Sequence, residues 1–185
     1  MSNDMNNLSQ PDRFAIRDYH PADWFAVCSV HDRARPDELS GSCDPRAFIP
    51  LADDQEDAPS FQRSKKFVAT WGDEIVGFVG IDGAYLSWLY VDPSYYRRGI
   101  GRALLRFAVN LIGPYAWTVV LADNFRARSL YESEGFVIVR TSQGSNAGYP
   151  CTSLRLALSP SLSEYGTDPK PSDEIEGTKQ AAPSS

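Results

Sequence analysis

Apolar and polar positions along this chain predict strands and helices that alternate, with turn residues between them. Apolar runs that are typical of strands cover residues 14–17, 67–71, 75–81, 85–91, 117–121, 136–140 and 151–158. Gly72-Asp73 and Asp82-Gly83 separate three consecutive runs and are typical of tight hairpin turns. The middle of the chain is therefore predicted to form antiparallel strands.

Three segments have the spacing of a helix that places a set of residues on one face. The first begins at Pro21 and places Trp24, Val27, Cys28 and His31 on one face. The second places Ile100, Leu104 and Ala108 on one face, and the third does so with Ala127, Leu130, Tyr131 and Glu134. Asp123 or Asn124 is a good N-cap for the third helix, and Gly135 a good C-terminal stop. Between 33 and 64 the pattern predicts loops, with a short helix near 45–51.

The length and composition predict one folded domain. The chain has 185 residues, of which 42% are hydrophobic, enough for a core of ordinary size. Residues 1–11 are polar, and the last segment, 159–185, is rich in Ser, Pro, Glu, Lys and Gly. We therefore expect a domain over 12–158 between a flexible N-terminus and a disordered C-terminal tail.

The segment 88–105 carries the strongest chemical signal. An apolar strand leads through a loop into Arg97 and Arg98, then Gly99 and Gly101, where the second helix begins, with Arg102 in its first turn. Glycines at a helix start expose backbone N–H groups, and the helix dipole adds positive potential there. Arginine side chains suit phosphate oxygens. These features predict a site for pyrophosphate, although a Gly-x-Gly alone is also compatible with a structural turn.

Two common phosphate-binding motifs are excluded. A P-loop needs Gly-Lys-Ser/Thr after its glycines, which this segment lacks. A dinucleotide fingerprint needs a third glycine at the position of Leu104.

Two motifs in the same order resemble the GCN5-related N-acetyltransferase (GNAT) family over about 14–158. The first is Gln/Arg-x-x-Gly-x-Gly/Ala, which reads Tyr96-x-x-Gly99-x-Gly101 here, with Tyr in place of Gln or Arg. The second is Asn-x-x-Ala…Tyr…Gly-Phe, which matches residues 124–136. The departure at Tyr96 is minor, because in this family backbone amides make most phosphate contacts.

The resemblance implies an α/β (α+β) fold with a mixed, mostly antiparallel sheet, flanked by helices and splayed between its fourth and fifth strands, 85–91 and 117–121. It also implies an N-acyltransferase that moves acetyl from acetyl-CoA to a primary amine of a small molecule or peptide by direct attack in a ternary complex. The cofactor would contact Leu89, Tyr90, Val91, Arg97, Arg98, Gly99, Ile100, Gly101, Arg102, Ala103, Asn124, Ser129 and Tyr131.

The resemblance assigns catalytic roles to two residues and leaves a third role open. The Leu89 N–H, or its neighbour's, would stabilise the oxyanion. Tyr131 would be the general acid, since a phenol stays protonated at neutral pH. No carboxylate precedes Asp92 on the strand 85–91, so the general base is a water relay that ends on Ser87, Tyr85 or a carboxylate of segment 33–38.

Two other function classes stay open, namely a non-catalytic acyl-CoA-binding or sensing module and an NAD-dependent or other nucleotide-binding domain. The presence of Tyr131 argues against the first, and ligand-binding measurements would separate the second.

Charge and composition narrow the partners. The net charge of −6 and a pI near 4.9 argue against nucleic acid. An odd number of cysteines, three, suits a reducing cytoplasm, and two distant histidines predict no metal. No apolar run could cross a membrane. The expected partners are acetyl-CoA, an amine acceptor and a second copy in a homodimer. Carboxylates outnumber arginines in segment 33–64, which favours a cationic acceptor.

Overall fold

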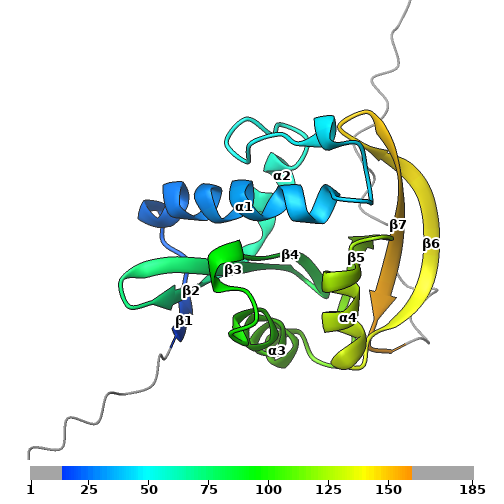
Figure 1. Ribbon diagram of the computed structural model, residues 1–185. Helices are drawn as coiled ribbons and strands as arrows, with labels where there is room; N and C mark the ends of the chain where they lie inside the picture. The colour runs from blue at the N-terminus through cyan, green and yellow to red at the C-terminus, as the bar shows by residue number, and fades with distance from the viewer. Residues whose placement is uncertain (1–13, 160–185) are drawn as a thin grey trace, which may run out of the picture.

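A seven-stranded sheet in the order β1-β2-β3-β4-β5-β7-β6 organises the computed structural model, which describes residues 14–159 (Figure 1). The strands are β1 (Phe14–Asp18), β2 (Lys65–Trp71), β3 (Glu74–Asp82), β4 (Tyr85–Val91), β5 (Trp117–Leu121), β6 (Val137–Asn146) and β7 (Tyr149–Ala157). Neighbouring strands are antiparallel except β4 and β5, which are parallel. The segments predicted to be flexible, 1–11 and nearly all of 159–185, lie outside the described residues.

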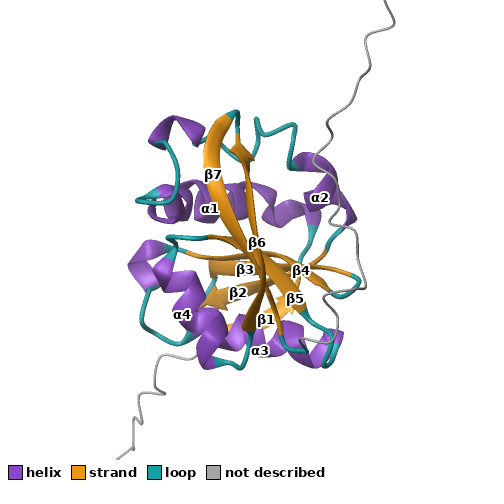
Figure 2. Cartoon of the chain, turned by 90° about the vertical axis from the view of Figure 1, so that its right-hand side faces the viewer, coloured by secondary structure: helices purple, strands orange, loops and turns teal. Residues whose placement is uncertain are grey.

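Helices cover both faces of the sheet (Figures 1 and 2). They are α1 (Trp24–Leu39), α2 (Ala58–Arg63), α3 (Ile100–Ile112) and α4 (Phe125–Ser133). One buried cluster joins α1 and α2 to one face, and a second joins α3 and α4 to the other. Among the described helices, none is long and apolar enough to cross a membrane.

The central strands are apolar throughout because both of their faces are covered. Phe78 of β3 packs in the cluster beneath α1, whereas the next residue, Val79, packs in the cluster beneath α3. On α3 the predicted stripe of Ile100, Leu104 and Ala108 is buried against the same cluster as Val79. The apolar spacing of this helix thus predicted its buried face correctly.

The fourth and fifth strands separate almost as soon as they meet. Their only ladder pair joins Tyr85 to Trp117, and the two rings stack with centroids 4.2 Å apart. One residue further on, the Thr118 hydroxyl donates to the Leu86 carbonyl oxygen at 2.9 Å. Beyond this point the strands diverge and leave a wedge between them, which confirms the predicted splay.

The segment between α1 and β2 differs from its prediction. The helix α1 runs through Pro36 to Leu39, where the sequence predicted a loop from residue 33 onwards. Proline removes one N–H bond in the last turn, but Ala34 and Leu39 are buried and offset this loss. A 3₁₀ turn (Pro45–Ala47) stands where a short helix was expected, and α2 was not predicted at all.

The last hairpin is longer than predicted. The strand β6 continues beyond Arg140 to Asn146, and β7 begins at Tyr149. Pairing with β7 holds this extension, although most of its side chains are polar and exposed. A strand without a buried face has no apolar alternation by which the sequence could reveal it.

Candidate active site

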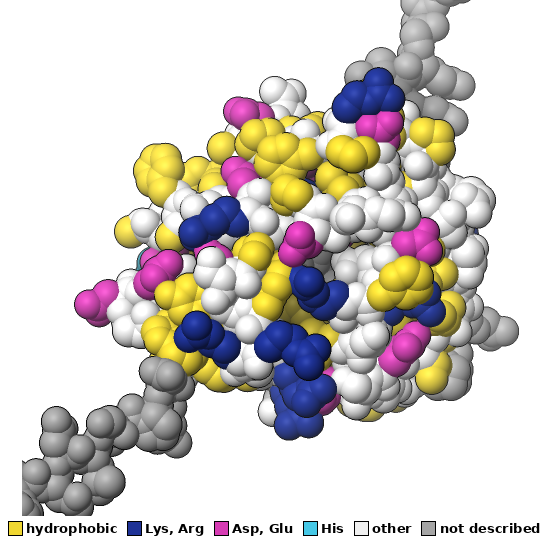
Figure 3. Space-filling model, in the orientation of Figure 1, with side chains coloured by type: hydrophobic (Ala, Val, Ile, Leu, Met, Phe, Trp, Pro, Cys, Tyr) yellow, Lys and Arg dark blue, Asp and Glu magenta, His cyan; other side chains and the backbone are white. Residues whose placement is uncertain are grey.

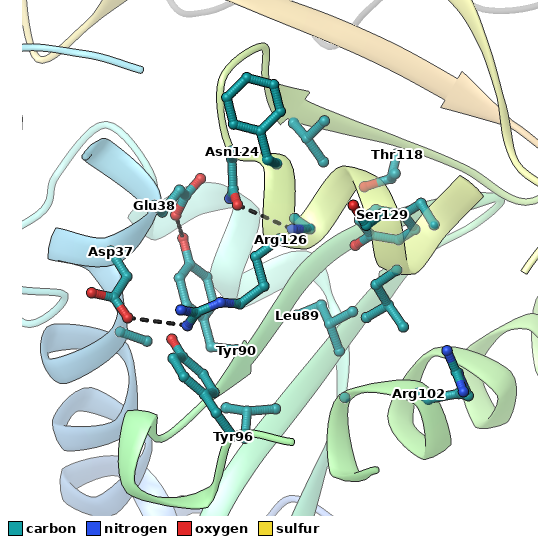
Figure 4. Close-up of a pocket in the computed structure, with 18 of the residues that line it drawn as sticks. Asp37, Glu38, Leu89, Tyr90, Tyr96, Arg102, Thr118, Asn124, Arg126 and Ser129 are labelled. Carbon is teal, nitrogen blue, oxygen red and sulfur yellow. Dashed lines mark hydrogen bonds and ion pairs between the residues drawn. The ribbon is translucent and has the colours of Figure 1, made fainter. Parts of the chain in front are cut away.

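The wedge between β4 and β5 opens into a cavity of about 1010 Å³. This volume is at the upper end of ligand pockets in proteins. Side chains from α1, β4, the loop after it, α3, β5 and α4 line the cavity (Figure 4). On the face drawn in Figure 3, basic and acidic side chains surround a hollow.

The start of α3 forms one wall and presents backbone donors. Gly99 is the N-cap with φ of 82°, in the left-handed region that favours glycine, and Arg97 also has a positive φ, 66°. The Ala103 N–H donates to the Gly99 carbonyl at 3.0 Å, which is the first hydrogen bond within the helix. The N–H groups before Ala103 therefore have no acceptor inside the helix. With the helix dipole, these donors give the wall a positive potential, and its binding of an anion stays a prediction.

The four arginines near this wall are held in different ways. Arg97 lines the cavity. Arg102 also lines it and pairs with Glu134 at 3.0 Å, and Arg106 pairs with the same carboxylate at 2.7 Å. Arg98 instead lies over the rings of Trp71 and Tyr95, with its guanidinium carbon 5.0 and 5.1 Å from the ring centroids.

Most of the predicted site residues meet in this cavity. Those that line it are Leu89, Tyr90, Val91, Arg97, Gly99, Ile100, Gly101, Arg102, Asn124, Ser129 and Tyr131. Arg98 and Ala103 do not line it. The side chain of Arg98 is drawn to the aromatic pair outside, and the N–H of Ala103 is used inside the helix. The contact of these two residues with the cofactor stays a prediction.

The backbone of β4 presents two N–H groups to the wedge. The Asp92 N–H donates to the Val76 carbonyl of β3 at 2.8 Å. Backbone groups alternate in direction along a strand. The N–H groups of Leu89 and Val91 therefore point away from β3, toward the space that β5 has left. The register between β3 and β4 shifts between Gly80 and Ile81, which leaves Ser87 of β4 unpaired in a bulge two residues before Leu89.

The Tyr131 side chain lies deep at the narrow end of the cavity. Tyr131 is 3% exposed, and its ring packs edge-on against the Phe136 ring, with the two centroids 5.3 Å apart. Its hydroxyl hydrogen-bonds the Thr118 hydroxyl. Burial raises the pKa of Tyr131, so the phenol keeps its proton at neutral pH.

Asn124 caps α4, as the sequence allowed. Its Oδ1 accepts from the Ala127 N–H at 3.1 Å (Figure 4). This bond fixes the side chain at the edge of the cavity and leaves the amide nitrogen as the donor for a ligand.

A cluster that the sequence did not reveal spans the mouth of the cavity. Arg126 of α4 pairs with Asp37 of α1 at 3.2 Å, and its guanidinium carbon lies 4.0 Å from the centroid of the Tyr96 ring. We call these three residues the Arg126 clasp (Figure 4). Tyr96 is the residue that departs from the Gln/Arg of the family pattern, and its contact with Arg126 gives that departure a structural role.

A second unpredicted cluster, the Arg35 network, lies on the α1 side of the cavity, and its members Glu38 and Tyr90 line the cavity. Arg35 is 8% exposed and pairs with Glu38 Oε2 at 2.6 Å, and it donates to Asn146 Oδ1 at 3.0 Å. The Tyr90 hydroxyl donates to Glu38 Oε2 at 2.5 Å. Burial and Glu38 raise the pKa of Tyr90 well above its usual value. The network therefore joins α1 to β4 and β6.

Asp57, just before α2, makes the stability of this region depend on pH. Burial, followed by Asp54, raises the pKa of Asp57 to about 6. A carboxyl whose pKa rises on folding stabilises the fold fully below its unfolded pKa and loses that contribution as pH rises through the folded value. We therefore expect Asp57→Asn to increase the free energy of unfolding at pH 7 by about 1–3 kcal/mol, and by much less at pH 4.

Urea unfolding at both pH values measures this effect. The control is Asp53→Asn, since Asp53 is an exposed carboxylate of the same segment. An equal change at pH 4 and pH 7, or equal changes in the two variants, would contradict a buried and perturbed Asp57.

Within residues 14–159, no three His, Cys, Asp or Glu side chains gather closely enough to hold a metal ion.

Comparison with known proteins identifies the domain. The model of the acetyltransferase (GNAT) domain matches residues 62–138. The chain is 28% identical over 158 residues to the uncharacterised N-acetyltransferase YafP of Escherichia coli, covering 84% of this chain and 99% of YafP. It is 33% identical over 84 residues to the peptidyl-lysine N-acetyltransferase YjaB of Salmonella typhimurium, covering 45% of this chain and 57% of YjaB.

Solved structures share the fold. A GCN5-related N-acetyltransferase from Rhodopseudomonas palustris superposes with a TM-score of 0.68 at 21% identity, covering 77% of this chain and 92% of that one. The PaiA N-acetyltransferase of Thermoplasma acidophilum, solved in complex with coenzyme A, gives 0.59 at 17% identity, covering 78% and 99%. With the motifs and the splayed sheet, these matches lead to one conclusion: the chain carries a GNAT acetyltransferase domain over residues 62–138 and has the fold of the GNAT structures.

Proposed function

We propose that this protein transfers an acetyl group from acetyl-CoA to a primary amine of a small molecule or peptide. The observation that carries the proposal is the wedge between β4 and β5, which joins an anion-binding wall to an acidic one. Backbone donors and arginines lie on the α3 side, whereas Asp37 and Glu38 lie on the α1 side. One end thus suits a phosphate-bearing donor and the other a cationic acceptor.

The cavity fits coenzyme A by its size and by its donors. The first N–H groups of α3, with Arg97, would hold the pyrophosphate, and the N–H groups of Leu89 and Val91 would pair with the amides of the pantetheine arm. Gly101 adds no side chain next to these donors, so it leaves space for the phosphates. When bound, acetyl-CoA supplies an activated acyl group with a thiolate as leaving group. The coenzyme A complex of the PaiA structure supports this choice.

Two groups of the chain would act on the reaction itself. The Leu89 N–H is a fixed donor for negative charge that develops on a carbonyl oxygen in the wedge. Tyr131, protonated and buried, would donate its proton to the departing sulfur. Asn124, fixed by its cap, would orient the ligand through its amide nitrogen.

Ligand binding and turnover test the proposal in sequence. Thermal shifts with acetyl-CoA, coenzyme A, NAD and ATP measure which nucleotide the cavity prefers, and acetyl-CoA and coenzyme A are expected to stabilise most. Thiol release with a panel of amines then measures transfer. Stabilisation by acetyl-CoA without thiol release from any amine would instead indicate a binding or sensing module, and stabilisation by NAD alone would indicate a different domain.

The acidic wall predicts a cationic acceptor. Asp37 and Glu38 line the cavity, and the segment that follows carries further carboxylates at Asp53, Asp54 and Glu56. These carboxylates would attract a cationic acceptor over a distance. Salt screens such attraction, with a screening length of roughly 8 Å at physiological ionic strength. We therefore expect polyamines, aminoglycosides or lysine peptides to be the best acceptors, with a KM that rises with salt. Steady-state kinetics at low and high salt measure this, and an anionic best acceptor would contradict it.

A further inference from the structure

Three carboxylates line the cavity in the described part of the chain, and one of them differs from the other two. Asp123 is exposed, and Asp37 is committed to Arg126 in the clasp. The side chain of Glu38 is 20% exposed and lies inward of Asp37 (Figure 4). Glu38 is therefore the carboxylate that a ligand would meet within the cavity.

The contacts of Glu38 hold its carboxylate in one orientation. Arg35 and the Tyr90 hydroxyl both bind Oε2, at 2.6 and 2.5 Å. Since both contacts fall on Oε2, Oε1 is the oxygen that can accept from a ligand. Arg35 is fixed in turn by Asn146. Two buried partners that bind one oxygen of a carboxylate fix the rotamer of the side chain. The second oxygen is then already oriented toward a ligand.

The position of Glu38 matches the side from which an acceptor would come. The anion-binding wall at α3 and Ser129 of α4 lie on one face of the sheet, and α1 covers the other (Figure 1). The wedge passes between β4 and β5 from one face toward the other. An acceptor that approaches from the α1 face reaches the wedge beside Glu38 and Tyr90.

We propose that Glu38 is the catalytic base, which binds the acceptor ammonium through Oε1 and takes its proton before transfer. This inference rests on the proposed acetyl transfer and adds the residue that activates the amine. Arg35 and Tyr90 are positioning residues, which act through the carboxylate. The other titratable groups whose charge Glu38 influences are His31 on α1, Asp57 before α2 and Tyr131 on α4.

The proton balance closes with groups on the chain. The ammonium gives one proton to Glu38 and becomes a neutral amine. The nitrogen lone pair forms the N–C bond with the acyl carbon, and the C–S bond breaks with its electron pair on sulfur. Tyr131 gives its proton to sulfur and regains the second proton from nitrogen, while Glu38 releases its proton to water. The products are an N-acetyl amine, a free thiol and one proton.

The other groups considered for this role are less suitable. Ser87 forms a hydrogen bond with the Ser64 hydroxyl at 2.7 Å, and neither group ionises at neutral pH. Tyr85 stacks on Trp117 at the closed end of the wedge. The hydroxyl of Tyr90 donates a hydrogen bond to Glu38 and keeps its own proton, so it is not a base. Of these groups, Glu38 alone combines a carboxylate with a place in the cavity.

The test compares Glu38→Gln with wild type on two acceptors over pH 7 to 9. The first acceptor is a blocked lysine peptide, whose amine has a pKa of roughly 10.4 and needs a base at pH 7. The second is hydroxylamine, which is already neutral there. We expect Glu38→Gln to lower kcat for the peptide at least about 10²-fold at pH 7, by less at pH 9, and to leave hydroxylamine turnover near wild type.

Two controls and a binding measurement accompany it. Asp37→Asn removes the neighbouring carboxylate and should change KM for the peptide without a pH-dependent loss in kcat. Asp73→Asn removes an exposed charge in the turn between β2 and β3, outside the cavity, and should change neither constant. Calorimetric titration with acetyl-CoA checks that Glu38→Gln keeps its donor affinity, and therefore its fold.

The outcomes separate this inference from the proposed function. Equal, pH-independent losses with both acceptors would mean that Glu38 only holds the structure, and would overturn its role as base. Full activity of Glu38→Gln on the peptide would do the same, while acetyl transfer itself would stand. Absence of thiol release from wild type with every amine would overturn the proposed function, and the assignment of Glu38 with it.

Discussion

Replacing Tyr131 with Phe is expected to lower kcat about 10²–10⁴-fold, the usual cost of losing a general acid. The variant removes one hydroxyl and keeps the ring that packs against Phe136. Thr118 still donates to the Leu86 carbonyl, so its hydroxyl keeps a hydrogen bond. Stability should therefore fall by only about 1 kcal/mol, and the affinity for acetyl-CoA should change little. Thiol release under saturating conditions, with titration of acetyl-CoA, measures these effects.

A matched control removes the same chemical group elsewhere. Tyr115, in the loop before β5, is 56% exposed, and Tyr115→Phe should leave kcat unchanged. If Tyr131→Phe releases thiol as fast as wild type with a good acceptor, Tyr131 serves packing and not proton transfer. A drop in acetyl-CoA affinity as large as the drop in kcat would point to the same revision.

Replacing Gly101 with Glu is expected to abolish acetyl-CoA binding in a protein that still folds. A Cβ at Gly101 would lie 3.5 Å from Leu130 and 3.6 Å from Val91, which are ordinary contacts, so the position itself accepts a side chain. A carboxylate in the first turn of a helix also suits the dipole. The same carboxylate would stand beside the donors that face the pyrophosphate, where it would repel the phosphates and occupy their space.

Two substitutions at the same residue separate these causes. Gly101→Ala adds only the Cβ, and should keep binding while stabilising the helix by about 1 kcal/mol. Gly101→Gln adds the bulk of Glu without its charge and should bind more weakly than Ala but better than Glu. Calorimetric titration of the three variants, with circular dichroism as the check on folding, gives the order. Wild-type affinity in a folded Gly101→Glu variant would show that the phosphates bind elsewhere.

The parts of this fold that sequence could predict are those in which local pattern and burial agree. The helix α3 shows this well, because Ile100, Leu104 and Ala108 repeat at helical spacing and all three are buried. Both Gly99 and Asn124 have the backbone and cap roles that their residue types suggested. The wall that presents backbone donors, and the placing of Tyr131 in the cavity, followed from these local signals.

The acidic wall could not be predicted in the same way. Its position depends on α1 continuing past Pro36, and burial of Ala34 and Leu39 against distant parts of the chain decides this. Arg35 is buried where Tyr90 of β4 and Asn146 of β6 reach it, and no spacing in the sequence shows these two contacts. The place of Arg98 could not be predicted for the same reason, since its guanidinium lies over the rings of Trp71 and Tyr95.

Because a single ladder pair, Tyr85 with Trp117, connects β4 to β5, we expect the sheet to behave as two cooperative units. The strands β1 to β4 form one hydrogen-bonded ladder, and β5, β7 and β6 form the other. Beyond the ladder pair and the hydrogen bond from Thr118 to Leu86, side-chain packing joins the units, because Leu86 of the first and Val120 of the second share one buried cluster with Tyr131. Local unfolding follows such boundaries. Hydrogen exchange at the junction therefore reports on the packing of that cluster, and a ligand whose amides lay between the strands would merge the two units into one.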